Sequence, residues 1–311
     1  MLRPAPILLI VLSVLSSISC QAPPEDWQSL NDEALALYDA GQFDQSIDVF
    51  KKALQVAKKA HGQQHAEVAI SHFNIGLGYA GKGDYQASAA SFERALKIER
   101  AIREPNEPEV ATTLAHLAEA YHLQGKTAAA IPLFEEALEL QSQTEKTDPL
   151  DLVDPMFDLA LIHQERENFE QAEALYHRAL EIERRRLGQF HPNVINTLTY
   201  LAGLQRQQGK HDQVQQTNQE ILAAQQENFG PEHPEVAAVY FHIGRDYHEQ
   251  GTFAEAEASY QQALKILAKR PASDPATLAT MKQHLAQLYR QTDRIELAEP
   301  LEQEAAGLIE D

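Results

Sequence analysis

One pattern returns every 42 residues along most of the chain and constrains the fold more than any other feature. In the copy at Gly251–Leu264 it reads GTFAEAEASYQQAL, a Gly followed by apolar residues at helical spacing. A fixed period of this length indicates stacked helical hairpins, each of which buries its apolar face only against its neighbours. We therefore predict an all-α fold, a right-handed α-α superhelical solenoid. Its seven helix–turn–helix repeats are expected at residues 27–68, 69–110, 111–152, 153–194, 195–236, 237–278 and 279–311.

Each slot of the pattern has a physical role. The opening slot ends the first helix of a hairpin in a left-handed conformation, which suits Gly, although two repeats carry Glu167 and Asp293 there. Nine residues later an aromatic slot fills the space between the two helices. In the fifth repeat this slot holds Asn218, so we interpret that repeat as the weakest. We predict that it opens first and that Asn218→Tyr would stabilise the array by about 1 kcal/mol.

The repeats resemble tetratricopeptide repeats, and two details are similar to the 42-residue subtype of kinesin light chains. The links LGQFHPNV (187–194) and FGPEHPEV (229–236) match that subtype's G-x-x-HP-x-V sequence, and Pro132 and Pro300 occupy the same early turn of a second helix. The resemblance covers residues 27–311 and implies a concave groove that binds an extended peptide without catalysis. In the subtype an Asn nine residues before the Gly slot contacts the peptide, and here only Asn74 matches.

The first 20 residues carry a different signal. A basic start at Arg3 precedes an apolar run, Ile7 to Ile18, that is too short to span a bilayer and suits a signal-peptide core. The run leads to Cys20, the single Cys of the chain, in a context that resembles a bacterial lipobox. We predict a lipoprotein-type signal peptide (1–19), lipid attachment at Cys20 and a short linker (20–26). A plain secreted chain, an uncleaved anchor and a buried thiol stay open as alternatives.

Charge and motifs argue against several classes of function. The formal net charge of −20 is opposite to the basic patches that mark nucleic-acid binding. The sequence contains no motif typical of phosphate-binding loops, zinc proteases or serine hydrolases. The pairs His116–His122 and His242–His248 are six apart, a spacing that does not put two ligands on one helix face. We therefore expect no enzyme activity, no cofactor and no metal site.

The repeat register assigns positions on the inner face of the solenoid. Acidic side chains fall mostly in repeats 1–4, whereas repeats 5–7 carry arginines that can each hold a carboxylate through two hydrogen bonds. We predict a polarised groove that binds an acidic segment or free C-terminus in repeats 5–7, more tightly as His side chains gain charge below about pH 6.5. Ordinary solvated side chains are the alternative. The candidate groove residues are Asn74, His116, Phe157, Asp158, Tyr200, Arg206, Phe241, His242, Arg245, His248, His284 and Arg290.

Two functional hypotheses follow. The first is a non-catalytic scaffold that binds an extended peptide or protein segment along its groove at the cell envelope. The alternative is a structural assembly factor, similar to pilotin-like lipoproteins of this repeat type, that organises a membrane complex through its outer faces or ends. By the lipoprotein resemblance, Gln21 suits sorting to the outer membrane with the solenoid facing the periplasm. A soluble secreted or periplasmic protein is the alternative location.

Overall fold

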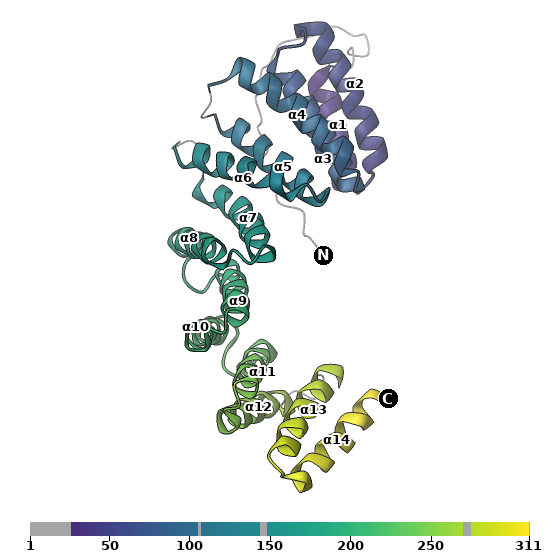
Figure 1. The fold of residues 1–311 in the computed structure, drawn as a ribbon. Coiled ribbons are helices and arrows are strands. Elements are labelled where there is room, and N and C mark those ends of the chain that lie inside the picture. Colours follow the sequence, from purple (N-terminus) through teal and green to yellow (C-terminus); the bar gives the residue numbers. More distant parts are fainter. Residues whose placement is uncertain (1–25, 105–106, 144–147, 270–274, 311) are drawn as a thin grey trace. The chain divides into compact units, whose positions relative to one another are not determined.

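The computed structural model of the chain describes residues 26–104, 107–143, 148–269 and 275–310. These residues form helices joined by short turns and links, and no strand occurs in the described ranges (Figure 1). The predicted signal peptide, Cys20 and Gln21 lie outside them. Among the residues described, no helix combines the length and the apolar character needed to cross a membrane.

The chain divides into two compact units, Met1–Arg103 and Glu104–Asp311. The first contains α1 (Trp27–Asp39), α2 (Phe43–His61), α3 (Ala66–Lys82) and α4 (Tyr85–Ile102). The second contains α5 (Pro108–Leu123), α6 (Thr127–Ser142), the short 3-10 helix η1 (Pro149–Leu152), α7 (Val153–Glu165), α8 (Phe169–Leu187), α9 (Pro192–Gln207), α10 (His211–Phe229), α11 (Pro234–Glu249), α12 (Phe253–Ala268), α13 (Pro275–Gln291) and α14 (Ile295–Glu310). Within each unit every α-helix packs against the next along the chain, which confirms the predicted all-α stack of helical hairpins.

The corner between the two helices of each hairpin has the predicted left-handed backbone. The two corners without Gly adopt it as well, with φ of 59° at Glu167 and 56° at Asp293. A left-handed conformation is unfavourable for residues with a Cβ, so the surrounding hairpin holds these two corners in place. The Gly corners are Gly41 (φ 72°), Gly83 (82°), Gly125 (77°), Gly209 (67°) and Gly251 (76°).

The aromatic slots form the centre of the hairpins. Phe50 and Phe92 in the first unit and Phe134, Tyr176 and Tyr260 in the second are at most 1% exposed. Their rings lie against small residues of the preceding helix, where a large side chain would force the two helices apart. In the second unit the helices approach closely at Gly244, where an added Cβ would lie only 2.6 Å from Cδ1 of Tyr260.

The links between hairpins use His as a helix cap. His65, His191 and His233 each precede an odd-numbered helix, and each ring Nδ1 accepts a hydrogen bond from the backbone N–H two residues on. The N···N distances are 3.3, 3.2 and 3.2 Å, respectively. Because the first amides of a helix have no partner within the helix, this bond stabilises its start. The links at 187–194 and 229–236 therefore have a structural role, which is to cap the helix that follows.

Candidate peptide-binding surface

The odd-numbered helices of the second unit share one face. Side chains on each of these helices interact with side chains on the next odd-numbered helix, so the face is continuous from α5 to α13. The interactions that link α5 to α7, α7 to α9, α9 to α11 and α11 to α13 are Glu119–Asp158, Phe157–Tyr200, Arg206–Asp246 and Phe241–His284. We call this surface the inner face.

An acidic zone lies at the α5–α7 end of the inner face. It consists of Glu119 on α5 with Asp154 and Asp158 on α7. Burial, followed by the charges of Glu119 and Asp154, raises the pKa of Asp158 to about 7. Partial desolvation and then Glu119 also raise the pKa of Asp154, which still lies exposed at the surface. The predicted contact residue His116 borders the zone, with its Nδ1 3.6 Å from Oε2 of Glu119. A cationic side chain placed beside Asp158 would relieve the repulsion among the carboxylates, so the zone suits a Lys or Arg.

Aromatic side chains follow on α7 and α9. The ring of Phe157 lies 5.3 Å from that of buried Tyr176 and 5.2 Å from that of Tyr200, measured between centroids. Tyr200 remains 40% exposed, and a tyrosine side chain combines an apolar ring with a polar hydroxyl. The other Phe among the candidate groove residues, Phe241, is only 9% exposed because it packs against Tyr260 and His284. Phe241 therefore packs mainly in the hydrophobic core and leaves little of its ring at the surface.

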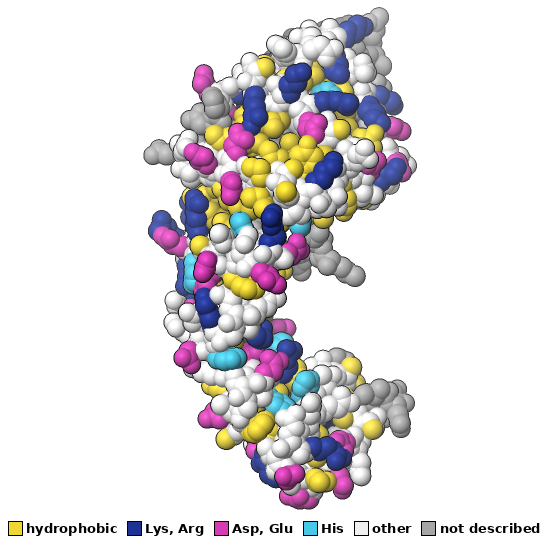
Figure 2. All heavy atoms as spheres, in the orientation of Figure 1, with side chains coloured by type: hydrophobic (Ala, Val, Ile, Leu, Met, Phe, Trp, Pro, Cys, Tyr) yellow, Lys and Arg dark blue, Asp and Glu magenta, His cyan; other side chains and the backbone are white. Residues whose placement is uncertain are grey.

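Imidazoles and one arginine form a third zone, which we call the imidazole zone, made of His242, Arg245 and His248 on α11 and His284 on α13. Figure 2 shows His side chains beside both basic and acidic ones in this region. The side chain of Arg245 is 38% exposed, and its Nη2 lies 3.9 Å from Oε1 of Glu249. Burial and then Arg245 lower the pKa of His242 and of His284. The predicted gain of charge near pH 6.5 is therefore wrong for these two imidazoles, which become charged only at lower pH.

The side chain of Arg206 is already hydrogen-bonded within the protein. Its Nε and Nη2 donate to Oδ1 and Oδ2 of Asp246 at 2.6 and 3.0 Å. Nδ2 of Asn218 donates to the same Oδ2 at 2.7 Å, and Asp246 is only 4% exposed. The interpretation of Asn218 as a missing ring was thus incomplete, because Asn218 supplies a hydrogen bond that the buried carboxylate needs. We call Arg206, Asn218 and Asp246 the buried network.

Arg290 is also paired within the chain. Its Nε and Nη2 donate to the two oxygens of Glu302 at 2.5 and 2.6 Å. This fork-shaped pair uses the geometry that was predicted for a ligand carboxylate. Three arginines were expected to bind a ligand carboxylate. Arg206 and Arg290 would first have to break their hydrogen bonds to Asp246 and Glu302. Arg245 has only a long ion pair, to Glu249, among the described residues.

In the first unit, Asn74 occupies the position of the peptide-contacting Asn in the similar subtype. It is 6% exposed, and its Nδ2 donates to Oδ1 of Asn31 at 2.7 Å. Asn31 is itself 6% exposed, so the two amides join α1 to α3 beneath the surface. Any role of Asn74 in peptide binding stays a prediction that would require this bond to open.

Sequence reasoning missed Asp246, although this residue differs in type from those at the equivalent position of the other repeats. The equivalent positions in other repeats hold small or aliphatic residues, namely Ala36, Gly78, Ala120, Ile162, Leu204 and Leu288. A carboxylate in such a column is costly unless another out-of-pattern polar residue satisfies it. Asn218, which stands in an aromatic column, is that partner.

The stacked hairpins define an α-α repeat protein, and comparison with known sequences identifies which kind. A family model described as tetratricopeptide repeat matches residues 28–101, 79–143, 153–227 and 215–269. The chain therefore belongs to the tetratricopeptide repeat family. No curated protein sequence matches the chain.

Solved structures with the same architecture include kinesin-light-chain-like proteins. BtubC (BKLC) from P. vanneervenii is 23% identical with a TM-score of 0.54, over 72% of this chain and 90% of that one. The repeats of a putative kinesin light chain from Podosopora anserina are 22% identical with a TM-score of 0.57, over 68% and 100%. The C-terminal part of a repeat protein from Cytophaga hutchinsonii is 12% identical with a TM-score of 0.66, over 89% and 95%. These likenesses show the shared fold.

Proposed function

We propose that the protein is a non-catalytic scaffold that binds an extended segment of a partner protein along the inner face of its second unit. The observation that carries this proposal is the order of zones on that face. Carboxylates lie at the α5–α7 end, exposed Tyr200 follows, and Arg245 with three imidazoles lies on α11 and α13. An extended chain that follows the face meets these zones in turn.

The chemistry of the zones indicates the character of the segment. Arg245 can form a fork-shaped pair with an Asp, a Glu or a C-terminal carboxylate, and the neutral imidazoles of His242 and His284 can donate hydrogen bonds to the same group. Asp158 favours a Lys or Arg because a nearby cation stabilises its charged form. We therefore propose a segment with a carboxylate at the imidazole zone and a basic side chain at the acidic zone. Family membership supports the proposal, since tetratricopeptide repeats typically serve as interaction scaffolds.

We propose the cell envelope as the location of this scaffold. The support is the N-terminal sequence, in which an apolar run leads to a single Cys20 followed by Gln21. A lipid anchor at Cys20 would hold the scaffold near the outer membrane, where its partner segment would be presented.

Selection from a random peptide library tests the binding proposal. Peptides selected on the wild-type protein should carry a carboxylate and a basic residue separated by apolar positions. Their affinity should fall at least about tenfold in Arg245→Glu, as expected for the loss of one charged pair and its reversal. Affinity should also fall as salt is raised, because the contacts are electrostatic and exposed.

Arg178 provides a matched control. It is an exposed arginine on the even-numbered helix α8. Arg178→Glu makes the same change of net charge away from the inner face, so it should leave peptide affinity unchanged. Equal losses in the two variants would mean that only net charge matters. Undiminished binding to Arg245→Glu would move the search to the outer faces.

A further inference from the structure

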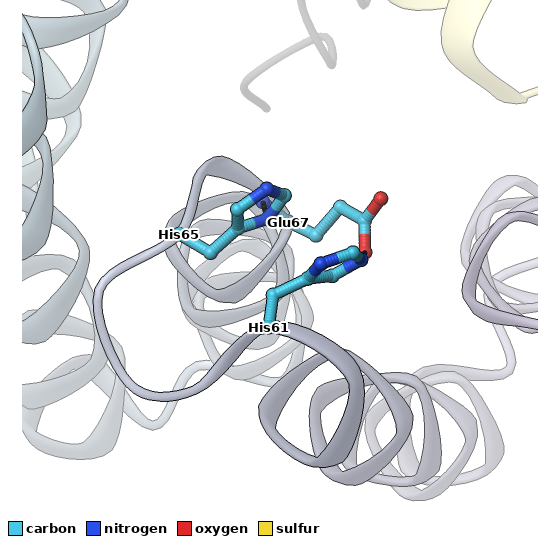
Figure 3. A group of neighbouring side chains, drawn as sticks. All are labelled: His61, His65 and Glu67. Atoms are coloured by element: carbon cyan, nitrogen blue, oxygen red, sulfur yellow. Dashed lines mark hydrogen bonds and ion pairs between the residues drawn. The ribbon is translucent and has the colours of Figure 1, made fainter.

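Two His side chains and one carboxylate meet where α2 ends and α3 begins in the first unit (Figure 3). His61 belongs to the last turn of α2, His65 caps α3, and Glu67 lies in the first turn of α3. One ligand atom from each residue lies within 4.8 Å of the other two. Nε2 of His61 is 3.3 Å from Oε2 of Glu67. The two side chains are 41% and 29% exposed, so an ion has access to them.

The equivalent links elsewhere in the chain show what is special about this one. His65 corresponds to His191 and His233, and all three cap a helix in the same way. In the link at 229–236 the ring of Phe229 stacks on His233 with centroids 4.7 Å apart. His61 takes the place of that Phe and stacks on His65 at 4.0 Å. The stacking is thus a feature of the link, whereas the extra ring nitrogens belong to His61 alone.

We propose that His61, His65 and Glu67 bind Zn²⁺ or a divalent cation of similar chemistry. Two imidazoles and one carboxylate are a donor set that zinc favours, and a water would complete a tetrahedral site. Ligand atoms about 2.0–2.1 Å from zinc at tetrahedral angles lie roughly 3.4 Å apart. The His61–Glu67 separation of 3.3 Å already meets this requirement. The expectation of no metal site rested on His pairs six residues apart, and His61 and His65 are four apart.

His65 has to move for the third ligand to bind. Its ring is nearly parallel to that of His61, with an interplanar angle of 16°, so the two ring planes cannot both contain the ion. Rotation of the His65 side chain turns a nitrogen toward the ion and breaks its capping bond to the Glu67 amide, which is 3.3 Å long. A bond of that kind contributes modestly, so its loss weakens zinc binding by about tenfold at most. The site is therefore expected to be of moderate affinity.

Zinc titration of the purified chain, with a chromophoric zinc indicator as competitor, tests the site. Wild-type protein should bind zinc and gain thermal stability as the zinc concentration rises. His61→Phe should keep the stacked link, because Phe229 shows that the link accepts this ring, yet lose zinc affinity by at least about tenfold. Cobalt in place of zinc should give the visible absorption bands of a tetrahedral site in the wild type and not in His61→Phe.

Two further variants separate ligation from capping. Asn is a good cap, so His65→Asn and His191→Asn should both fold. Only His65→Asn should lose zinc affinity, because His191 has no second His beside it at the corresponding position, which is Leu187. The proposal is overturned if wild-type protein binds no zinc, if His61→Phe and His65→Asn bind it as tightly as wild type, or if His191→Asn reduces binding equally.

Discussion

The buried network leads to a prediction about stability that opposes the expectation from sequence. Replacing Asn218 with Tyr restores the ring that the slot carries in the neighbouring repeats. It also removes the hydrogen bond of 2.7 Å to Oδ2 of Asp246, a carboxylate that is 4% exposed. A hydrogen bond to a charged group contributes about 1.5–3 kcal/mol, and leaving the acceptor unsatisfied adds to the loss. The buried ring recovers part of this, so Asn218→Tyr is expected to destabilise the fifth and sixth repeats by about 1–2 kcal/mol.

Asp246→Leu provides the second arm of a double-mutant cycle. Alone it removes the partner of Arg206 and Asn218 and should destabilise, although the guanidinium, whose side chain is 32% exposed, can turn to water. With both substitutions the site acquires the residues found at Tyr260 and Leu288 in the following repeats. Replacing a buried ionic group by packed apolar residues is often neutral or stabilising by about 1–4 kcal/mol. The coupling between the two substitutions should therefore be about 2–4 kcal/mol in favour of the double variant.

Native-state hydrogen exchange measures these effects locally, which matters because a repeat array need not unfold in one step. Amides of residues 196–226 should exchange faster than those of 238–268 in wild type, and faster still in each single variant. The double variant should restore or exceed wild-type protection. If Asn218→Tyr alone raises protection, or if the two effects add, the reasoning about the buried network is refuted.

Two other predictions concern Asp158 and the N-terminus. The pKa of Asp158 is about 7 in the folded state, above its usual value in an unfolded chain. At low pH the carboxyl is protonated in both states, and its contribution to stability is fully present. As the pH rises through 7 the half-buried carboxyl has to ionise, so stability falls. Asp158→Asn should therefore raise the free energy of unfolding at pH 8 by no more than about 4 kcal/mol, and the melting temperature with it, and change both little at pH 4. An equal effect at both pH values would contradict the raised pKa. Intact-mass analysis of native protein should show an N-terminal Cys20 carrying acyl groups, two or more of which are needed for stable membrane attachment. An unmodified Cys20 would exclude the anchor.

Features that depend on a single position of the 42-residue repeat were predictable from the sequence, whereas contacts between different positions were not. The hairpin corners follow from a single slot, and even Glu167 and Asp293 obey it because the rest of the hairpin imposes the conformation. Asn218 and Asp246 each look like a defect when judged alone, and only their proximity across 28 residues makes them complementary. Arg290 was assigned to a ligand for the same reason, since nothing in its own column reveals Glu302 on the next helix.

The close approach at Gly244 has a mechanical consequence for binding. Hairpins are joined in series, so a side chain that wedges α11 from α12 would tilt the helices that follow as a group. A helix of 16 residues is about 24 Å long, and a tilt of roughly 5° moves its far end by about 2 Å. The spacing between Arg245 on α11 and His284 on α13 is therefore sensitive to one absent methyl group beside Tyr260. A substitution at Gly244 can thus change the spacing of the proposed binding residues while those residues themselves stay the same.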